Sequence, residues 1–426
     1  MIMKNITLAI DLGSTSFKAA IFAADMRLLS EVEHKLTYLK TADNEIEIAH
    51  DEVNHAIQTV VSQAISSAKI AITDITAVGI ASQAQTFTFI DANGTPVRPF
   101  ISWLDTRAVK TCEAMRNEAV FNDFAAHCSV ERLYPTMLIC LVRHLMNEPN
   151  ADYANCQLIP LPSYIIHRLT GRNVTDNNLS AISGLYSLQT QSWYKPYLDY
   201  CNLTVTQMPE LIKVGELAGQ VTDKTFLDLP LGCNIFTCGN DQTAGAYGAE
   251  LSLGDILVNL GTAHVTYARR KELPEPEYDL CRGEYPGELY YAMCAENGGA
   301  ILTAILAAFP EFESFDNLAK LAEQTDGKGV KFNADITNLN NFSWQGENAS
   351  LEQKAYAVFD YLAERIKIMT DMVSGHNPDV KKIYLTGGGR KNRILVNLIK
   401  EKIGENIIEL ETSPLQGVAL NKRMRE

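Results

Sequence analysis

The stretch Ile6-Thr-Leu-Ala-Ile-Asp11-Leu-Gly13-Ser-Thr-Ser-Phe-Lys18-Ala-Ala-Ile-Phe-Ala23 places two apolar runs on either side of a short glycine turn. Both runs have the Ile and Phe content of buried strands. The turn, residues 12–16, is too short for the crossover that two parallel strands need. We therefore predict an antiparallel β-hairpin, and residues 28–36 have the composition of a third strand.

After this hairpin the pattern changes to a helix period, with apolar residues from Val53 to Ile65 on one face and Asp51 placed to cap the first turn. Residues 77–81 follow as a fully buried strand. This order predicts a mixed α/β fold, unlike the strict βαβ alternation of a doubly wound sheet. The remaining segments are predicted as strands at 86–91, 185–188 and 382–385, helices at 113–147 and 392–403, and a long loop at 272–288.

A second copy of the opening layout predicts two domains. Residues 256–260, the turn Gly261-Thr262 and residues 265–268 repeat the order strand, glycine turn, strand. Between the two copies, residues 239–248 are small and rich in Gly and Ala, which suits close helix packing or a hinge. We place the boundary there and predict domains at 1–244 and 245–426.

The composition argues against several classes of protein. The 426 residues carry 37 basic and 51 acidic side chains, a formal net charge of −14, which disfavours sequence-independent binding to nucleic acid. No apolar run approaches the ~20 residues that span a bilayer, and the first residues lack the zones of a signal peptide. The nine cysteines form no Cys-x-x-Cys pair. We therefore expect reduced thiols and a cytoplasmic protein that binds neither membrane nor nucleic acid.

Three glycine turns follow predicted buried strands, at residues 11–16, 260–262 and 386–389. Glycine lets backbone N–H groups approach phosphate oxygens, and Ser and Thr hydroxyls add donors. Each turn alone is ordinary. The three together, with an acid leading the first, predict phosphate binding, although neither a P-loop nor a Gly-x-Gly-x-x-Gly turn after a strand is present.

Asp11 ends a buried strand beside Gly13, so it is placed to hold Mg²⁺ through water, while Lys18 returns near the phosphates. The alternative is that Asp11 only caps the turn. The histidines have no metal-binding spacing, and His264 is the one that follows the second glycine turn.

In their order along nearly the whole chain, these motifs resemble the FGGY family of carbohydrate kinases. The family's first phosphate motif resembles residues 11–18, and its Trp-x-Asp-x-Arg element matches Trp103-Leu-Asp105-Thr-Arg107. The segment that carries its catalytic aspartate resembles Gly239-Asn-Asp241-Gln242. Its second phosphate motif and its adenosine motif resemble residues 260–262 and 387–392.

The resemblance implies an α/β protein with the two-domain actin-like ATPase fold, also called ribonuclease H-like, with ATP and sugar in a cleft between the domains. It implies that ATP is bound by Ser14, Thr15, Ser16, Lys18, Gly261, Thr262, Gly299, Gly388, Gly389 and Asn392. It implies that the sugar is bound by Gln83, Ala84, Gln85, Trp103, Asp105 and Gln242, beside the catalytic Asp241.

Asp241 is the candidate general base, because phosphoryl transfer asks the protein for little beyond alignment, charge neutralisation and a proton acceptor. A helix N-cap is the alternative role for Asp241, and both roles can coexist. Asp105 and Arg107 lie two residues apart on an extended segment, so they point the same way. They either pair with each other or grip a polyol, with Trp103 offering an apolar face to sugar C–H groups.

The segment Gln83-Ala84-Gln85-Thr86 departs from the family, whose pentulose kinases usually carry Gln-Met-His-Gly and whose glycerol kinases carry Gln-Arg-Glu-Thr. The second domain is also short for the family. We predict an ATP- and Mg²⁺-dependent kinase of a small sugar or polyol, with a ketose such as a pentulose as substrate and a homodimer as a compatible assembly. The alternatives are a kinase of glycerol or another short polyol, and a non-catalytic, nucleotide-gated sugar-binding protein.

Overall fold

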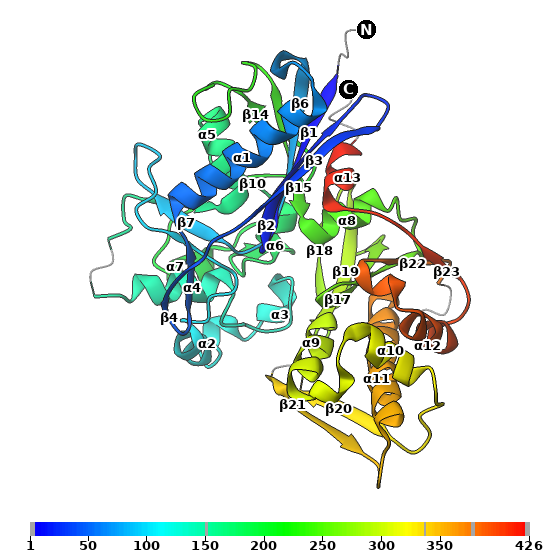
Figure 1. The fold of residues 1–426 in the computed structure, drawn as a ribbon. Coiled ribbons are helices and arrows are strands. Elements are labelled where there is room, and N and C mark those ends of the chain that lie inside the picture. Colours follow the sequence, from blue (N-terminus) through cyan, green and yellow to red (C-terminus); the bar gives the residue numbers. More distant parts are fainter. Residues whose placement is uncertain (1–4, 150–151, 336–337, 376–379, 422–426) are drawn as a thin grey trace. The chain divides into compact units, whose positions relative to one another are not determined.

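The computed structural model describes residues 5–149, 152–335, 338–375 and 380–421. The chain forms two compact units, whose elements are labelled in Figure 1. The first unit contains Met1–Gly248, Glu275–Tyr290 and Ser413–Glu426, and the second contains Ala249–Pro274 and Tyr291–Thr412. The chain therefore leaves the first unit after Gly248, close to the boundary that we expected after residue 244, and later returns to it twice.

The first unit is built on a sheet with the strand order β14-β15-β6-β1-β2-β3. β1 (Ile6–Leu12) and β2 (Ser16–Phe22) are antiparallel, with Asp11 opposite Lys18 in the register. β3 (Leu28–Lys35) pairs with the other side of β2, and β6 (Ile75–Ser82) runs parallel to β1. The predicted hairpin, third strand and buried strand are confirmed.

α1 (His50–Ala68) packs on this sheet through the apolar face that the sequence predicted. Val53, Ile57 and Val60 are buried in the same core cluster as Leu8 and Ile10 of β1. The burial of each such side chain stabilises the folded state by about 1.5–3 kcal/mol. The capping role expected for Asp51 is wrong, because the helix begins one residue earlier and its N-cap is Ala49, whose side chain has no acceptor.

A second sheet of the first unit has the order β4-β5-β8-β7-β9. The other strands of this unit are β4 (Leu39–Ala42), β5 (Glu45–Ile48), β7 (Phe87–Ile90), β8 (Phe100–Ile101), β9 (Gln157–Pro160), β10 (Val174–Asp176), β11 (Tyr186–Ser187), β12 (Ser192–Trp193), β13 (Glu210–Ile212), β14 (Leu217–Gln220), β15 (Asn234–Asn240) and β18 (Cys281–Tyr285). Its other helices are α2 (Val109–Met115), α3 (Phe124–His127), α4 (Leu138–Met146), α5 (Leu161–Thr170), α6 (Asn177–Ala181), α7 (Lys195–Tyr200), α8 (Asp241–Gly248) and α13 (Pro414–Ala419), with 3-10 turns at Ile72–Asp74, Ala119–Phe121 and Val205–Gln207.

The second unit repeats this layout on its own sheet, where the strands follow the order β19-β17-β16-β22-β23. β16 (Ile256–Leu260) is antiparallel to β17 (Ala263–Arg270) and parallel to β22 (Ile383–Thr386). In the first unit, β1 likewise has one antiparallel neighbour, β2, and one parallel neighbour, β6. The predicted internal repeat is therefore confirmed. The other elements are β19 (Leu289–Asn297), β20 (Lys331–Asp335), β21 (Asn338–Gln345), β23 (Ile407–Glu409), α9 (Gly299–Ala308), α10 (Phe315–Ala322), α11 (Leu351–Ser374) and α12 (Arg393–Ile403), with 3-10 turns at Pro310–Phe312 and Gly388–Lys391.

The Gly- and Ala-rich segment 239–248 forms the end of β15 and the whole of α8. α8 packs against α13, where a Cβ on Gly417 would lie only 1.7 Å from the carbonyl oxygen of Ala244. Ala244, Leu415 and Val418 share one buried apolar cluster. Of the two roles expected for these small residues, close helix packing is the one that the first unit uses.

Two segments differ from the expected secondary structure. Residues 113–147 are not one helix, because α2 ends at Met115 and α4 begins only at Leu138, just after Pro135, which cannot donate a helical hydrogen bond. The expected loop at 272–288 contains β18, whose strand character the acidic and Pro-rich sequence does not reveal. The backbone N–H of Arg282 in this strand donates to the carbonyl of Ser129 at 2.9 Å. None of the helices in the described ranges is long and apolar enough to cross a membrane.

Candidate active site

The candidate site of the first unit lies where β1, β6 and β15 end. β6 lies between the other two strands and is parallel to both, so the carboxyl ends of all three share one edge of the sheet. This edge carries Asp11 near the end of β1, Gln83 directly after β6, and Asp241 directly after β15. Such edges are where open α/β sheets bind their ligands.

Asp11 and Asp241 interact electrostatically at this edge. Burial raises the pKa of Asp11 to about 7, the charge of Asp241 adds to the rise, and Lys18 opposes it. Asp11 is only 7% exposed, and its Oδ1 has no hydrogen-bond partner among the described residues. Because an unpartnered buried carboxylate oxygen is costly, Asp11 is suited to hold a cation or a proton.

This unpartnered oxygen fits the Mg²⁺ site predicted at Asp11. Within the described ranges, no cluster of three His, Cys, Asp or Glu side chains could enclose a metal ion. Mg²⁺ usually keeps several waters and is held by one or two carboxylates together with substrate phosphates. Asp11, with Asp241 nearby, matches that donor set.

Asp241 is the first residue of α8, and burial raises the pKa of its carboxyl. Its Oδ1 accepts from the backbone N–H of Gln242 at 2.9 Å, and the side-chain amide of Gln242 donates to Oδ2 at 3.3 Å. The helix cap is Asn240, whose Oδ1 accepts from the backbone N–H of Thr243 at 2.8 Å. Asn240 therefore caps α8, and Asp241 is not needed for that role.

Asn178 holds this loop in place, although none of the sequence motifs includes it. Its Oδ1 accepts from the backbone and side-chain amides of Asn240, both at 2.9 Å. Its Nδ2 donates to Thr243 Oγ1 at 3.0 Å and to the carbonyl oxygen of Glu284 at 2.7 Å. No sequence signal points to Asn178, because its partners come from segments that only the fold brings together.

The predicted sugar-binding segment after β6 has both strained and unpartnered groups. Gln83 is buried, its Nε2 donates to the Gly13 carbonyl at 3.4 Å, and its Oε1 has no partner in the described part of the chain. Ala84 is half-buried. Gln85 has a φ of 69°, which residues other than glycine seldom adopt, and its Oε1 accepts from the Leu138 N–H at 2.8 Å. Strain of this kind is concentrated at ligand sites.

Trp103 lies on the loop that follows β8 and is 38% exposed. Its backbone N–H donates to Thr86 Oγ1 at 3.2 Å, which ties this loop to the segment after Gln85. An exposed indole presents an apolar face at this position.

The structure does not support the expectation that Asp105 accepts sugar hydroxyls. Asp105 is completely buried, and its two oxygens accept from the Ile46 N–H at 2.7 Å and from Arg107 Nε and Nη2 at 2.9 and 2.7 Å. Glu47 Oε1 accepts from Arg107 and from Arg98, at 2.8 and 3.0 Å. The structural ion pair, which was the alternative, accounts for all these contacts, and Asp105 thereby anchors the Trp103 loop.

The first phosphate turn connects β1 to β2. A Cβ on Gly13 would lie 2.9 Å from the Ser16 carbonyl oxygen, so the turn needs glycine there. Ser14 is half-buried, Thr15 is exposed, and Ser16 is buried at the start of β2. Lys18 then lies opposite Asp11 in the strand register.

The second unit contains a cavity of about 820 Å³. Its lining includes every residue of this unit that was predicted to bind ATP: Gly261, Thr262, Gly299, Gly388, Gly389 and Asn392. They come from the β16–β17 turn, the start of α9, and the turn between β22 and α12, where Asn392 caps the helix by accepting from the Leu395 N–H at 3.1 Å. The volume falls within the range of about 300–1,000 Å³ that small-molecule sites occupy.

Sequence motifs missed one wall of this cavity. Phe315, Asp316 and Lys320 of α10 line it, and so does Leu302 of α9. α10 has no glycine turn and Leu302 lies inside α9, so no local signal marks these residues. His264 also lines the cavity, and burial lowers its pKa to about 4, which leaves the ring neutral at pH 7.

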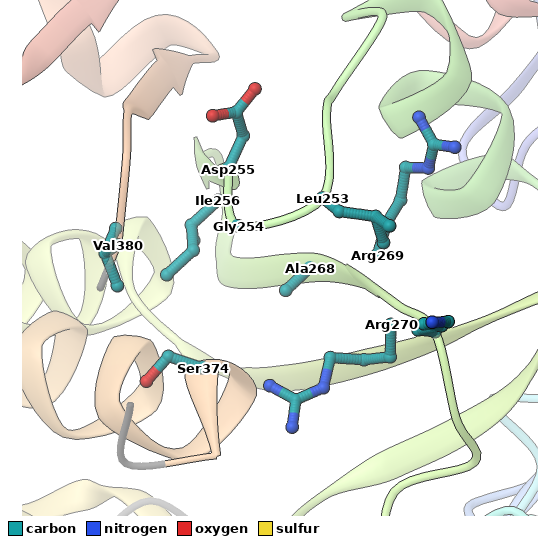
Figure 2. A pocket seen from close by; sticks show the side chains of 10 residues that line it. Leu253, Gly254, Asp255, Ile256, Ala268, Arg269, Arg270, Ser374 and Val380 are labelled. Atoms are coloured by element: carbon teal, nitrogen blue, oxygen red, sulfur yellow. The ribbon is translucent and has the colours of Figure 1, made fainter. Parts of the chain in front are cut away.

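A smaller cavity of about 180 Å³ lies elsewhere in the second unit, between Ile256 of β16, Ala268 of β17 and Ser374 of α11 (Figure 2). None of the residues predicted to bind sugar or phosphate lines it. It therefore carries no part of the candidate active site.

Two units on repeated sheets, with carboxylates at a sheet edge and a separate cavity beside glycine turns, define the class of two-domain proteins with the actin-like ATPase fold. A ligand-bound xylulose kinase from Lactobacillus acidophilus has this fold: it matches with a TM-score of 0.89 at 16% identity, over 99% of this chain and 89% of its own. A glycerol kinase from Plasmodium falciparum with ADP matches with a TM-score of 0.87 at 16% identity, over 99% and 93%. The predicted fold class is confirmed.

The chain belongs to the FGGY family of carbohydrate kinases, since the model of the family's N-terminal domain matches residues 6–248. A glycerol kinase from Agrobacterium fabrum is 26% identical over 249 residues, which are 57% of this chain and 49% of the relative. A xylulose kinase from Staphylococcus xylosus is 21% identical over 452 residues, 98% of this chain and 90% of the relative. This chain thus covers about half of the first relative and nine tenths of the second.

Proposed function

We propose that this protein transfers the γ-phosphoryl group of ATP to a hydroxyl of a small sugar or polyol. The observation that carries the proposal is the pair Asp11 and Asp241 at one sheet edge, with the buried Oδ1 of Asp11 unpartnered among the described residues. Membership of the FGGY family supports the same reaction. The cavity of about 820 Å³ in the second unit has the size and the glycine turns that a nucleotide requires.

In the proposed mechanism Asp241 is the general base. The substrate hydroxyl gives its proton to the Asp241 carboxylate as its oxygen bonds to the γ-phosphorus, and the bond from that phosphorus to the bridging oxygen breaks to release ADP. The raised pKa of Asp241 supports this role, because a base is most effective when its pKa approaches the working pH. The Gln242 N–H orients the carboxylate through the bond at 2.9 Å.

Asp11 would hold Mg²⁺ through water, and the metal would neutralise charge on the phosphates. Lys18 and the hydroxyls of Ser14, Thr15 and Ser16 would bind the same phosphates from the first unit. In the second unit, Gly261, Thr262 and Gly299 would contribute backbone donors, while Gly388, Gly389 and Asn392 would hold the adenosine.

For the substrate we propose a ketose such as a pentulose. Gln83 Oε1 offers a buried acceptor without a partner in the described residues, and the Gln85 amide group offers a donor. Trp103 would cover the C–H face of the sugar, and Gln242 would complete the pocket. Ala84 is small and leaves room above these groups.

Glycerol or another short polyol is the second candidate substrate. Gln83 and Thr86 are the two residues of this segment shared with the Gln-Arg-Glu-Thr pattern of glycerol kinases. Thr86 serves as a backbone support, because its hydroxyl accepts from the Trp103 N–H at 3.2 Å. The shared Thr86 is therefore explained by its support of the Trp103 loop and is not evidence for a glycerol substrate. For this reason we rank glycerol second.

A substrate screen tests the proposal directly. Purified protein with ATP and Mg²⁺ is offered D-xylulose, D-ribulose, L-ribulose, glycerol and erythritol, and both ADP and the phosphorylated product are measured. We expect turnover with at least one ketose and a higher kcat/KM for it than for glycerol. Binding of a sugar by thermal shift without any phosphorylated product would instead support the non-catalytic sugar-binding protein.

A further inference from the structure

A polar cavity of about 570 Å³ lies in the first unit, apart from the sheet edge that carries Asp241. Its walls come from α6, β11, the segment after β13, and residues 284–290. None of the residues predicted to bind sugar, phosphate or metal lines it. The proposed kinase reaction therefore leaves this cavity without a role.

Glu284 supplies a buried acceptor in the wall of this cavity. The residue is 5% exposed, and its Oε1 accepts from the Tyr186 hydroxyl at 2.6 Å. Its Oε2 has no hydrogen-bond partner in the described part of the protein. Since buried carboxylate oxygens are nearly always satisfied, this oxygen calls for a donor from a ligand.

The charged residues that line the cavity indicate which kind of ligand would donate this hydrogen bond to Glu284. Glu216, Glu284 and Glu288 are acidic, and Lys213 is the one basic residue of the lining. Lys213 is already paired, because its Nζ lies 3.0 Å from Glu288 Oε1. The lining thus has an excess of negative charge, which attracts cations and repels phosphates.

The size and the lining of the cavity favour an organic occupant over a bare metal ion. A volume of about 570 Å³ suits an organic molecule. No group of three metal-ligating side chains occurs within the described ranges. Tyr186 and Tyr290 also line the cavity, and tyrosine rings attract organic cations through their π faces.

We propose that this cavity binds a small organic cation, whose ammonium group donates a hydrogen bond to Glu284 Oε2. Asn178 donates to the Glu284 carbonyl and accepts from Asn240. Asn178 thereby connects the wall that holds the ligand to the Asp241 loop, and the ligand takes no part in the phosphoryl transfer proposed above.

Isothermal titration with 1,4-diaminobutane tests the proposal, with 1,4-butanediol as the neutral probe of the same length. Both are titrated at 150 mM salt into wild type, Glu284→Gln, Glu288→Gln and Glu210→Gln. Glu210 is an exposed acid of β13 that does not line the cavity, so Glu210→Gln controls for nonspecific attraction to an acidic protein. Binding is measured without ATP or sugar, so the result does not depend on the proposed kinase activity.

We expect the diamine to bind wild type and the diol not to bind. Glu284→Gln should weaken binding by about tenfold or more, because it removes the charged acceptor. Glu288→Gln should weaken it by about two- to threefold, because Glu288 lines the cavity but is exposed to solvent. Glu210→Gln should bind as wild type does.

The proposal is overturned if the diamine does not bind wild type at millimolar concentration, if the diol binds equally well, or if Glu210→Gln weakens binding as much as Glu284→Gln. If Glu284→Gln does not fold, as judged by its melting curve, Glu288→Gln decides: unchanged binding by that variant overturns the proposal, and weakened binding supports it.

Discussion

Asp11 and Asp105 are both buried acids of the first unit, yet their surroundings differ in one decisive respect. Asp105 has hydrogen bonds from Ile46 and Arg107 on both oxygens. Asp11 faces a second acid, Asp241, and its Oδ1 has no partner among the described residues. Burial alone therefore does not mark a reactive carboxylate. The difference lies in whether the acid's acceptors are already satisfied by the protein.

The largest expected effect comes from Asp241, the second acid that Asp11 faces. Asp241→Asn should lower kcat by about 10²–10⁴, because the amide keeps the shape of the side chain and loses its basicity. The melting temperature should stay close to that of wild type, since Asn240 provides the helix cap. Steady-state kinetics at saturating substrates, together with thermal melts, measure both. Equal turnover by the variant would remove Asp241 from the mechanism.

Both oxygens of Asp105 already accept hydrogen bonds, so we expect its substitution to lower the stability of the protein. Asp105→Ala should lower the free energy of unfolding by about 3–5 kcal/mol, because it breaks a buried ion pair and leaves Arg107 only Glu47, a carboxylate that it shares with Arg98. Urea denaturation measures this, and Asp25→Ala, at an exposed ion pair, is the matched control. A variant that is as stable as wild type and shows only a raised KM for sugar would restore the role in sugar binding first expected for Asp105.

Glu284 is an intermediate case, with one satisfied oxygen and one unpartnered in the described residues. Burial raises its pKa from 4.5 to about 7, so between these pH values the unfolded chain loses a proton that the folded protein keeps. The contribution of Glu284 to stability should therefore fall as the pH rises from about 4.5 to about 7, by roughly 3 kcal/mol, and then level off.

Urea denaturation of wild type and Glu284→Gln at several pH values isolates this contribution. The difference in stability between the two proteins should change across the window and be constant above it. Parallel curves for the two proteins would show that Glu284 titrates alike in the folded and unfolded states.

The smallest expected effect belongs to Trp103, which the Asp105 network supports. Trp103→Ala should raise the KM for the sugar by about two- to tenfold, the loss of one partly exposed aromatic contact, with little change in the KM for ATP. Trp344→Ala is the matched tryptophan control, because it lies on β21 of the second unit and lines neither the cavity beside Gln83 and Gln85 nor the cavity beside the glycine turns. An effect on the KM for ATP alone would move Trp103 out of the sugar site.

Local sequence predicted the parts of the fold that depend on short-range patterns. The hairpin of β1 and β2 follows from two apolar runs and a glycine turn, and its repeat in β16 and β17 follows from the same pattern. The end of α12 was predicted from Gly404 because a helix that stops at glycine carries its own signal. By contrast, β18 was missed because the acidic and Pro-rich sequence around it has no strand pattern.

The residues of the candidate site likewise fall into those that local sequence motifs identified and those that they did not. The motifs identified Asp11, Asp241 and the glycine turns, because phosphate chemistry restricts which residues can stand there. They did not identify Asn178 or the α10 wall of the nucleotide cavity, since polar support and apolar lining have no local pattern.

The sequence by itself determined the family, the repeated strand-turn-strand layout and the residues that can carry phosphate chemistry, because each depends on residue types at fixed short spacing. Only the tertiary structure decided which of those residues remain available. Asp105 and Asp11 are both acids in family motifs. The backbone N–H of Ile46 and the guanidinium of Arg107 satisfy the oxygens of Asp105, whereas Asp11 lies near the second acid, Asp241. Hydrogen-bond satisfaction is a property of groups brought together in space, and no spacing along the chain encodes it.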